Sequence, residues 1–504
     1  MDLIYIFLAL IIWFIIGVFI ANLARKHLGK GMPEFFLANR KLSGFISAMT
    51  YSATTFSAFM MVGLVGLTYE TGVGAVGFEM IYIIFTILLL LIFAPRFWVA
   101  SQKYGIITPP ELLSKRYRSK WVGIISSVIS LGMLIPYASA QMMGIGYLME
   151  GMTSVSLPTI NLLGLSIPGL YLAGILLVAG YSAVSALWAG MRSVSWTDAF
   201  QALVMIIASI VLLLFVFYHF FEGTSGFVTE IEMNHSHLLE IDWDLSMFIG
   251  MTLPWAFFAL TNPQVSQRMF VPDSVKGLKK MILYFSIFAL IYTIITTLLG
   301  FSIAGIEGMG YFSIDDADNA MPMLLGLKEV PVILALTVFV SIFAAATSTL
   351  SSVVLTLSSL GSRDIVKSLK PEISERFEVY SGKLIITLII FVCIIFANLR
   401  IEMIAVLSSI ASGGLLVMAP TIIGSFFWKG STVEGALSSM IVGGVITSFL
   451  YITEYYPLGW WPSFWGLLLT LTIFVSVSLF TERPRGTEKF LDEVEKGVKE
   501  KGMI

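Results

Sequence analysis

The chain has few charged residues, a single cysteine and four histidines. Charged side chains make up 12% of its 504 residues and hydrophobic ones 57%, whereas a soluble protein has about 25% charged residues. This composition excludes a soluble globular fold and predicts an all-α protein that crosses a membrane many times. The lone Cys393 excludes an intramolecular disulfide, and the histidines lack the spacing of a metal centre. The net charge of −2 points to no particular partner, and we expect none among nucleic acids.

The apolar runs define the predicted membrane spans. The first run, residues 3–20, follows Met-Asp without a basic region, so we interpret it as a membrane helix rather than a cleavable signal. A hydropathy window of about 19 residues predicts thirteen spans. They cover residues 3–22, 44–69, 73–95, 121–149, 168–190, 195–220, 246–266, 281–305, 331–361, 382–399, 403–428, 433–452 and 459–480. We therefore expect a multi-pass protein of the cell membrane.

The positive charges predict how these spans are oriented. Basic residues are enriched in cytoplasmic loops, and all but two of the 30 Lys and Arg residues fall in alternate connections if the N-terminus lies outside. The sequence thus predicts an outside N-terminus and a cytoplasmic C-terminus. The opposite loops, 221–245 and 306–330, are acidic. We interpret them as solvated loops; alternatively, the second forms a lid or attracts cations.

The chain is predicted to form one transmembrane domain, residues 1–480, followed by a cytoplasmic tail, residues 481–504. Apolar residues recur at helical spacing in the tail, which predicts a short amphipathic helix on the cytoplasmic face. These residues are Phe490, Leu491, Val494 and Val498. The tail is too short for an enzyme module or a sensor-output domain, so we expect neither an enzyme nor an organic cofactor.

Two spans are interrupted by residues that break helices. The second has five Ser and Thr residues within positions 50–57, and the seventh contains Pro254 and Pro263. Hydroxyl side chains bend helices by bonding to carbonyls, and proline removes a backbone donor. Broken helices in corresponding positions are typical of secondary transporters, although close packing of small residues also explains the hydroxyl cluster. The spacing predicts two inverted five-helix repeats, about residues 44–220 and 246–428.

The ninth span carries a row of small and hydroxyl residues. Ala345, Ser348, Thr349 and Ser352 share one helix face. Hydroxyl and carbonyl oxygens are ligands that hard cations prefer, and this face could supply about five of them together with carbonyls freed by the break in the second span. The pattern indicates a sodium site, and helix packing through Ala and Ser is the alternative.

Two carboxylates fall within spans, where an unpaired charge is costly and indicates function. Glu79 lies in the third span and could bind a solute or a proton. Asp198 lies near the start of the sixth span, where an exposed acid at a helix N-terminus is the alternative. Trp255 and Phe258 flank the break in the seventh span and could stack on a solute or simply pack. We interpret Arg268, which ends that span, as an anchor at the cytoplasmic face.

Five stretches of the sequence resemble the sodium/solute symporter family, whose members transport proline, pantothenate, sugars or sialic acid together with sodium. They are residues 53–63 (ATTFSAFMMVG), 194–198 (VSWTD), 267–268 (QR), 344–352 (AAATSTLSS) and 435–444 (GALSSMIVGG). The resemblance covers nearly the whole chain. It implies the leucine-transporter-type fold, which has two inverted five-helix repeats, here with extra helices.

The resemblance also implies a set of site residues. The main sodium site would use the carbonyls of Ala53, Phe56 and Ala345 and the hydroxyls of Ser348 and Thr349. A second sodium, found in some members, would use Asp198, Ser351 and Ser352. The solute would lie near Thr55, Ser57, Glu79, Trp255, Phe258 and Ala259. Thr55 differs from both the proline and the sugar pattern, whereas Glu79 agrees with the sugar pattern, so the solute stays open.

Together these features predict a sodium-coupled symporter that moves a small polar organic solute into the cell by alternating access. We favour a carboxylated solute, such as an amino acid, a monocarboxylate or pantothenate, because half-helix N-termini favour anions. The alternatives are a proton-coupled symporter that uses Glu79 or Asp198, a sugar symporter, or a membrane sensor without transport. The expected partners are the solute, sodium ions and the lipid bilayer, with no obligatory protein partner.

Overall fold

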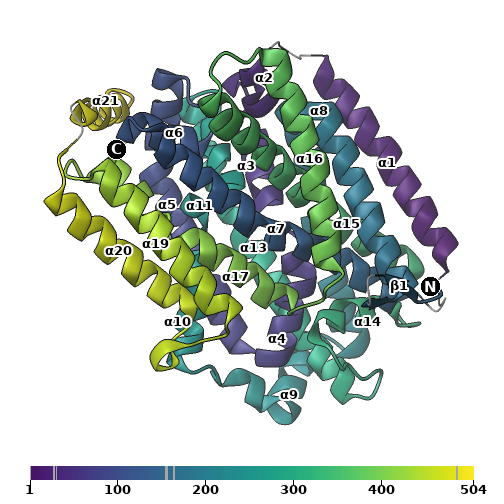
Figure 1. Ribbon diagram of the computed structural model, residues 1–504. Helices are drawn as coiled ribbons and strands as arrows, with labels where there is room; N and C mark the ends of the chain where they lie inside the picture. Colours follow the sequence, from purple (N-terminus) through teal and green to yellow (C-terminus); the bar gives the residue numbers. More distant parts are fainter. Residues whose placement is uncertain are drawn as a thin grey trace.

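The structure is a bundle of long helices (Figure 1). It is a computed structural model that describes residues 2–26, 29, 31–153, 157–162, 165–483 and 486–503. The long helices are α1 (Leu3–Arg25), α5 (Val73–Tyr104), α7 (Lys120–Met152), α8 (Gly169–Phe220), α13 (Val275–Gly308), α15 (Val332–Ser359), α16 (Glu375–Ala397), α19 (Val433–Ile452) and α20 (Pro462–Phe480). Within the described residues, ten helical stretches are long and apolar enough to cross a membrane, and bent helix pairs add up to two more. The predicted polytopic all-α fold is confirmed.

Three of the expected spans are interrupted. α3 (Gly44–Thr55) is followed at 54° by η2 (Phe59–Leu64) and α4 (Val65–Thr71), and α17 (Ile404–Leu416) is followed at 44° by α18 (Ala419–Phe427). The expected seventh span is divided into α10 (Leu245–Ala256), α11 (Phe258–Thr261), α12 (Pro263–Ser266) and η4 (Gln267–Phe270). Its longest piece, α10, is shorter than a membrane-crossing helix. The count of thirteen spans and their orientation therefore stay predictions.

Short elements connect the long helices. They are α2 (Met32–Leu37), η1 (Ala38–Arg40), α6 (Pro109–Tyr117), β1 (Ile160–Leu162), β2 (Leu165–Ile167), α9 (Thr224–Asn234), η3 (Ser236–Leu239), η5 (Ala317–Asn319), α14 (Ala320–Gly326), η6 (Leu360–Lys367), η7 (Pro457–Gly459) and α21 (Thr487–Glu500). β1 and β2 form an antiparallel hairpin in which Ile160 lies opposite Ile167. Elements α2, α6 and α21 lie at one end of the bundle and α9 at the other (Figure 1).

The fifth and sixth expected spans are two helical stretches, Gly169–Leu187 and Gly190–Phe220, which follow each other directly within α8. A cytoplasmic link was expected between them at residues 190–195, but the chain leaves the helical conformation there only at Gly190, with φ 60° and ψ 178°. A positive φ of this kind is accessible to glycine and costly for residues with a side chain. The two spans therefore meet at a sharp glycine bend instead of a loop.

The break after α3 is held by hydrogen bonds from protein groups. Phe56 ends the helix in an extended conformation, with φ −96° and ψ 105°. The Ser57 hydroxyl accepts the Phe59 N–H at 3.2 Å, as a capping serine does at the start of a helix. The Ala58 N–H donates to the side-chain carbonyl of Gln141, in α7, at 3.1 Å. Irregular backbone at membrane depth is tolerated when protein groups satisfy it in this way.

The interrupted second and seventh spans are joined at one end by a short backbone ladder. The N–H of Leu42, just before α3, donates to the Val271 carbonyl at 3.3 Å, and the Asp273 N–H donates to the Leu42 carbonyl at 3.0 Å. The Trp98 indole N–H, in α5, donates to the Pro272 carbonyl at 2.8 Å. The start of the first interrupted segment is thus fixed to the end of the second.

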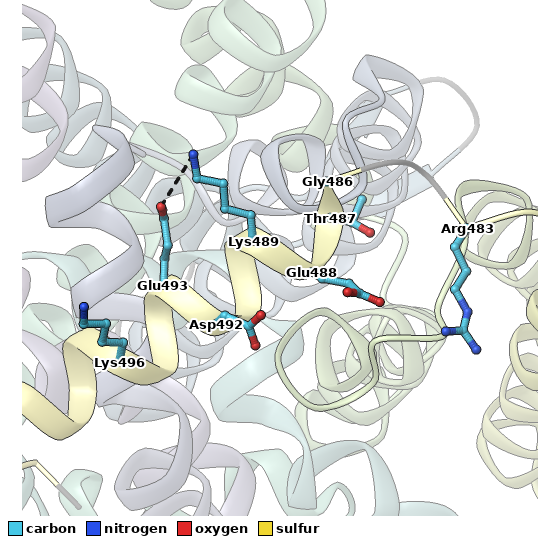
Figure 2. Close-up of a pocket in the computed structure, with 8 residues that line it drawn as sticks. All are labelled: Arg483, Gly486, Thr487, Glu488, Lys489, Asp492, Glu493 and Lys496. Carbon is cyan, nitrogen blue, oxygen red and sulfur yellow. Dashed lines mark ion pairs between the residues drawn. The ribbon is translucent and has the colours of Figure 1, made fainter.

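The tail forms the helix α21, and its apolar side faces the protein. Its buried apolar residues are Phe490, Leu491, Val494 and Val498. The Tyr104 ring of α5 stacks on Phe490 with 5.0 Å between the ring centroids, and Arg96 of α5 pairs with Glu495 at 3.1 Å. Charged side chains occupy the rest of the helix (Figure 2). The tail is therefore docked on α5.

The acidic loop between α13 and α15 is only partly a solvated loop. It carries η5 and α14, and Asp318 within it is 1% exposed. One carboxylate oxygen of Asp318 accepts the N–H of Ile404, at the start of α17, at 2.9 Å. Burial raises the pKa of Asp318 from 3.8 to about 7, the Ile404 N–H opposes this rise, and the nearby Asp316 and Glu70 add to it.

The raised pKa of Asp318 predicts that the docked loop is more stable in acid. Ionised Asp318 must be desolvated when the loop docks, so docking favours the protonated form. The stability that this group contributes is fully present below pH 4 and is lost as the pH rises towards about 7. Three pKa units correspond to about 4 kcal/mol, which is the upper bound of the effect.

Asp318→Asn should therefore raise the thermal midpoint at pH 8 and leave it nearly unchanged at pH 4, because asparagine keeps the acceptor for Ile404 without the charge. The measurement is the melting midpoint of both proteins across this pH range. Asp315→Asn, at an exposed carboxylate of the same loop, is the matched control. An equal pH dependence in wild type and Asp318→Asn would contradict the prediction.

Candidate functional site

The break after α3 lies against the hydroxyl face of α15. The Ser348 hydroxyl is 2.9 Å from the Ala53 carbonyl oxygen and 3.0 Å from that of Ala345. The Thr349 hydroxyl is 3.1 Å from the Ala53 carbonyl. Four of the five residues predicted for the main sodium site therefore meet, and Phe56 follows as the extended end of α3. Hydroxyls can rotate to present lone pairs, so this cluster can offer oxygen ligands to a cation.

The residues predicted for the second sodium site are drawn into a buried charged network. Asp198 is 1% exposed and Arg268 is 0% exposed. The Asp198 carboxylate accepts the Thr50 hydroxyl at 2.7 Å and lies 4.0 Å from an Arg268 nitrogen. The same nitrogen donates to the Ser352 hydroxyl at 2.6 Å. The Ser351 hydroxyl is buried and has no hydrogen-bond partner among the described residues.

The interpretation of Arg268 as a surface anchor is therefore wrong. The chain re-enters the bundle through α11, α12 and η4, and this path buries the guanidinium beside Asp198. Asp198 is likewise not an exposed acid at a helix end, because it is 1% exposed and lies about two turns after Gly190, where its helical stretch begins. Since both groups are buried, each charge is compensated mainly by the other, and removing one would leave the other buried without a counter-charge.

All six residues predicted to surround the solute are buried. Trp255 stacks on Phe258, with 5.0 Å between the ring centroids, and the Trp255 indole N–H donates to the Ser409 hydroxyl of α17 at 2.8 Å. Ala259 follows in α11. Glu79, in α5, is fully buried, and neither of its oxygens has a hydrogen-bond partner in the described part of the chain.

Three further residues were missed by sequence reasoning. Tyr82, one turn after Glu79, packs edge-on against Trp255 with 5.1 Å between the ring centroids. Tyr137 packs against Phe258 at 6.0 Å, and Gln141 binds the backbone of the break. The signal for Gln141 was present in the sequence, because a lone amide inside a long apolar span needs a buried partner.

A surface hollow beside α21 contains none of these residues. It is lined by charged and polar side chains of the tail, including Lys489 and Glu493, which pair at 3.9 Å (Figure 2). Mixed charges that pair with one another on a surface provide no desolvated binding group. The buried clusters around α3, α8 and α15 are therefore the candidate site.

The family is decided by comparison with known proteins. Residues 35–443 match the model of the family described as "Sodium:solute symporter family". The chain belongs to the sodium:solute symporter family. It is 29% identical over 467 residues to a sodium/pantothenate symporter of Haemophilus influenzae, which covers 89% of this chain and 90% of the relative. It is 26% identical over 481 residues to a high-affinity proline transporter of Bacillus subtilis, with 92% and 96% covered.

The fold agrees with a solved member of this class of transporter. The chain superposes on a Na⁺-coupled sialic acid symporter, solved in a substrate-bound outward-open state, with a TM-score of 0.76 at 17% sequence identity. The match covers 95% of this chain and 98% of that protein. The protein is thus a sodium-coupled symporter of small solutes, located in the cell membrane, with sodium as the co-transported ion. Members of the family are transporters and not enzymes.

Proposed function

We propose that sodium entering with the solute binds where the break after α3 meets α15. The carbonyls of Ala53, Phe56 and Ala345 and the hydroxyls of Ser348 and Thr349 would be its ligands. The observation that supports this most is the convergence of both hydroxyls on the Ala53 carbonyl across two helices. Neutral oxygens bind sodium weakly enough for release, which a transported ion requires.

The solute is proposed to bind on the other side of the same break, near Thr55, Ser57, Glu79, Trp255, Phe258 and Ala259. Sodium at Ala53 would hold the irregular backbone in one arrangement, and this backbone would complete the solute site. Two sites that share a segment have a coupling free energy, so the solute must tighten sodium binding as much as sodium tightens solute binding. Alternating access would expose both sites together to each side in turn, within the proposed repeats 44–220 and 246–428.

A second sodium at Asp198, Ser351 and Ser352 is proposed only with a movement of Arg268. The guanidinium donates to Ser352 and lies beside the Asp198 carboxylate, so it supplies the positive charge that a sodium ion would bring. The unpartnered Ser351 hydroxyl is the remaining ligand. We further propose that the protein works in the lipid bilayer without an obligatory protein partner or nucleic acid.

A proton-coupled mechanism is the second candidate, and the unpartnered Glu79 carboxylate favours it. A carboxyl in this position could carry a proton across the membrane if it faced each side in turn. Asp198 is less suited to this role because it already accepts a hydrogen bond and faces a guanidinium.

The test compares sodium with potassium at matched ionic strength. Purified protein should melt at a higher temperature in sodium, because an ion that binds the folded state stabilises it by mass action. Proteoliposomes should then accumulate a stabilising solute only down an inward sodium gradient. Equal melting in both salts, with uptake that follows a pH gradient, would establish the proton-coupled mechanism instead.

A further inference from the structure

Glu79 lies among buried polar groups. The hydroxyls of Tyr82 and Tyr137 are buried and lack hydrogen-bond partners among the described residues. Both lie within electrostatic reach of the carboxylate, and the Thr293 hydroxyl faces it. Buried polar groups are normally fully satisfied, so this cluster of four groups from α5, α7 and α13 indicates a bound molecule.

Aromatic rings form the rest of the surroundings. Trp255 lies at the centre of the group, with Phe59 at 4.7 Å, Phe258 at 5.0 Å and Tyr82 at 5.1 Å between ring centroids. Phe78, the neighbour of Glu79 in sequence, packs edge-on against Trp255 at 5.9 Å. Phe59 and Phe258 stack on Trp255, so these rings form an apolar wall beside the polar cluster.

Glu79 has no counter-charge among the described residues. No ion pair between described residues includes it, and the buried cation Arg268 is held by Ser352 and Asp198. A buried carboxylate without a counter-charge is strongly unfavourable, and such a group takes up a proton instead. An ammonium group on a solute would take the place of that proton and let the carboxylate stay ionised, whereas an anionic group would meet no positive charge here.

We propose that the transported solute carries a protonated amine, whose ammonium group binds the Glu79 carboxylate beside the wall of rings that contains Trp255, Phe258 and Tyr82. This inference rests on the proposed solute site and adds the chemical class of the solute to it. An ammonium donates to the carboxylate and neutralises it, while the tyrosine and threonine hydroxyls accept its remaining N–H groups. A carboxylate elsewhere on the solute, as in an amino acid, is compatible with this arrangement but is not needed for it.

The test is a melting screen of the full-length protein in saturating sodium. The probes are the twenty standard amino acids and ethanolamine, each with an ammonium group, and the amine-free compounds L-lactate, D-pantothenate and D-glucose. L-Alanine and L-lactate form a matched pair that differs at one substituent. At least one amine should raise the midpoint and bind at least tenfold more tightly than any amine-free compound. Tighter binding of an amine-free probe, or no shift with any amine, would overturn the proposal.

Variants of Glu79 then test the contact itself. Glu79→Gln keeps the shape and one hydrogen-bond acceptor but removes the carboxylate charge, so it should weaken binding of the best amine at least tenfold. Glu79→Asp keeps the charge and should retain the preference for amines. Thr86→Val removes another unpartnered buried group from α5 and should leave the preference for amines unchanged. Unchanged amine affinity in Glu79→Gln would also overturn the proposal.

The midpoint shift produced by sodium alone separates this inference from the proposed sodium site. Glu79→Gln should preserve that shift, which also shows that the variant folds. A lost sodium shift in the wild-type protein would count against the proposed coupling site, whatever the amines do. A preserved sodium shift with selective binding of lactate or glucose would reject the amine and leave sodium coupling intact.

Discussion

Replacing Ser348 and Thr349 together with alanine is expected to raise the sodium concentration for half-maximal uptake by about two orders of magnitude. Both hydroxyls lie within 3.1 Å of the Ala53 carbonyl and so belong to one ligand set. An interaction between a polar group and a charge contributes about 1.5–3 kcal/mol, and each 1.4 kcal/mol is a factor of ten in affinity. Either single variant should therefore shift the requirement about tenfold.

The same variants should be measured by two methods. A sodium titration of the melting midpoint reports binding, and sodium-dependent uptake reports coupling. Thr347→Ala is the matched control, since the Thr347 hydroxyl is equally buried on α15 but bonds only to the Phe343 and Ala344 carbonyls of its own helix. If Thr347→Ala and Ser348→Ala shift the sodium requirement equally, the effect comes from helix packing and the ligand assignment is wrong.

Solute affinity gives a second expectation for the Ser348 and Thr349 variants. Because coupling is reciprocal, weaker sodium binding in these variants must lower solute affinity at low sodium. Saturating sodium should restore the solute affinity of the wild type. A packing defect at α15 would lower solute affinity at every sodium concentration.

The long helices were predictable because a membrane span must be apolar over about 20 residues, whatever it packs against. The breaks at positions 50–57 and at Pro254 and Pro263 were visible for a related reason. Hydroxyls and prolines have no general use inside such a span. The division of α8 into two spans was also predictable, but a single glycine at position 190 turns the chain where a loop was expected.

Contacts between distant residues were predictable only where the family pattern supplied them. The approach of Ser348 to Ala53 joins residues 295 positions apart, and no periodicity contains that information. The burial of Arg268 was missed because hydropathy places a basic residue at the end of a span in the cytoplasm. Its real position follows from the path of α11, α12 and η4 and from its partner on α8. Gln141 was missed because its partner is the backbone N–H of Ala58. That N–H needs a side-chain acceptor only because the helix breaks after α3.

The misses at Arg268 and Gln141 share a physical origin that bears on function. Both concern a polar group whose cost of burial is offset by a partner on another helix, and such pairings define the sites of a transporter. Apolar positions are constrained by the bilayer and can be predicted from the order of residues in the sequence. Buried polar positions are constrained by three-dimensional neighbours, and the free energy of an unpaired one is several kcal/mol.

Asp198→Asn is expected to abolish most of the folded, transport-active protein. Removing one partner of a buried ion pair costs about 3–5 kcal/mol, because the other charge stays buried without compensation. Here the remaining group is Arg268, which is 0% exposed and keeps only its hydrogen bonds to Ser352 and to the Gln264 carbonyl. The Thr50 hydroxyl can still donate to the asparagine oxygen, so the loss reports charge and not hydrogen bonding.

The double variant Asp198→Asn with Arg268→Gln removes both charges and should recover much of the stability lost in Asp198→Asn. Melting midpoints of the wild type, both single variants and the double variant complete a cycle, whose coupling term isolates the interaction between Asp198 and Arg268.

The double variant then tests the second sodium site. If Asp198 binds an ion during transport, the double variant folds, yet its uptake rises with sodium less steeply than that of the wild type. If Asp198 serves only Arg268, the steepness is unchanged. A single variant that melts like the wild type would show that the two groups are not coupled.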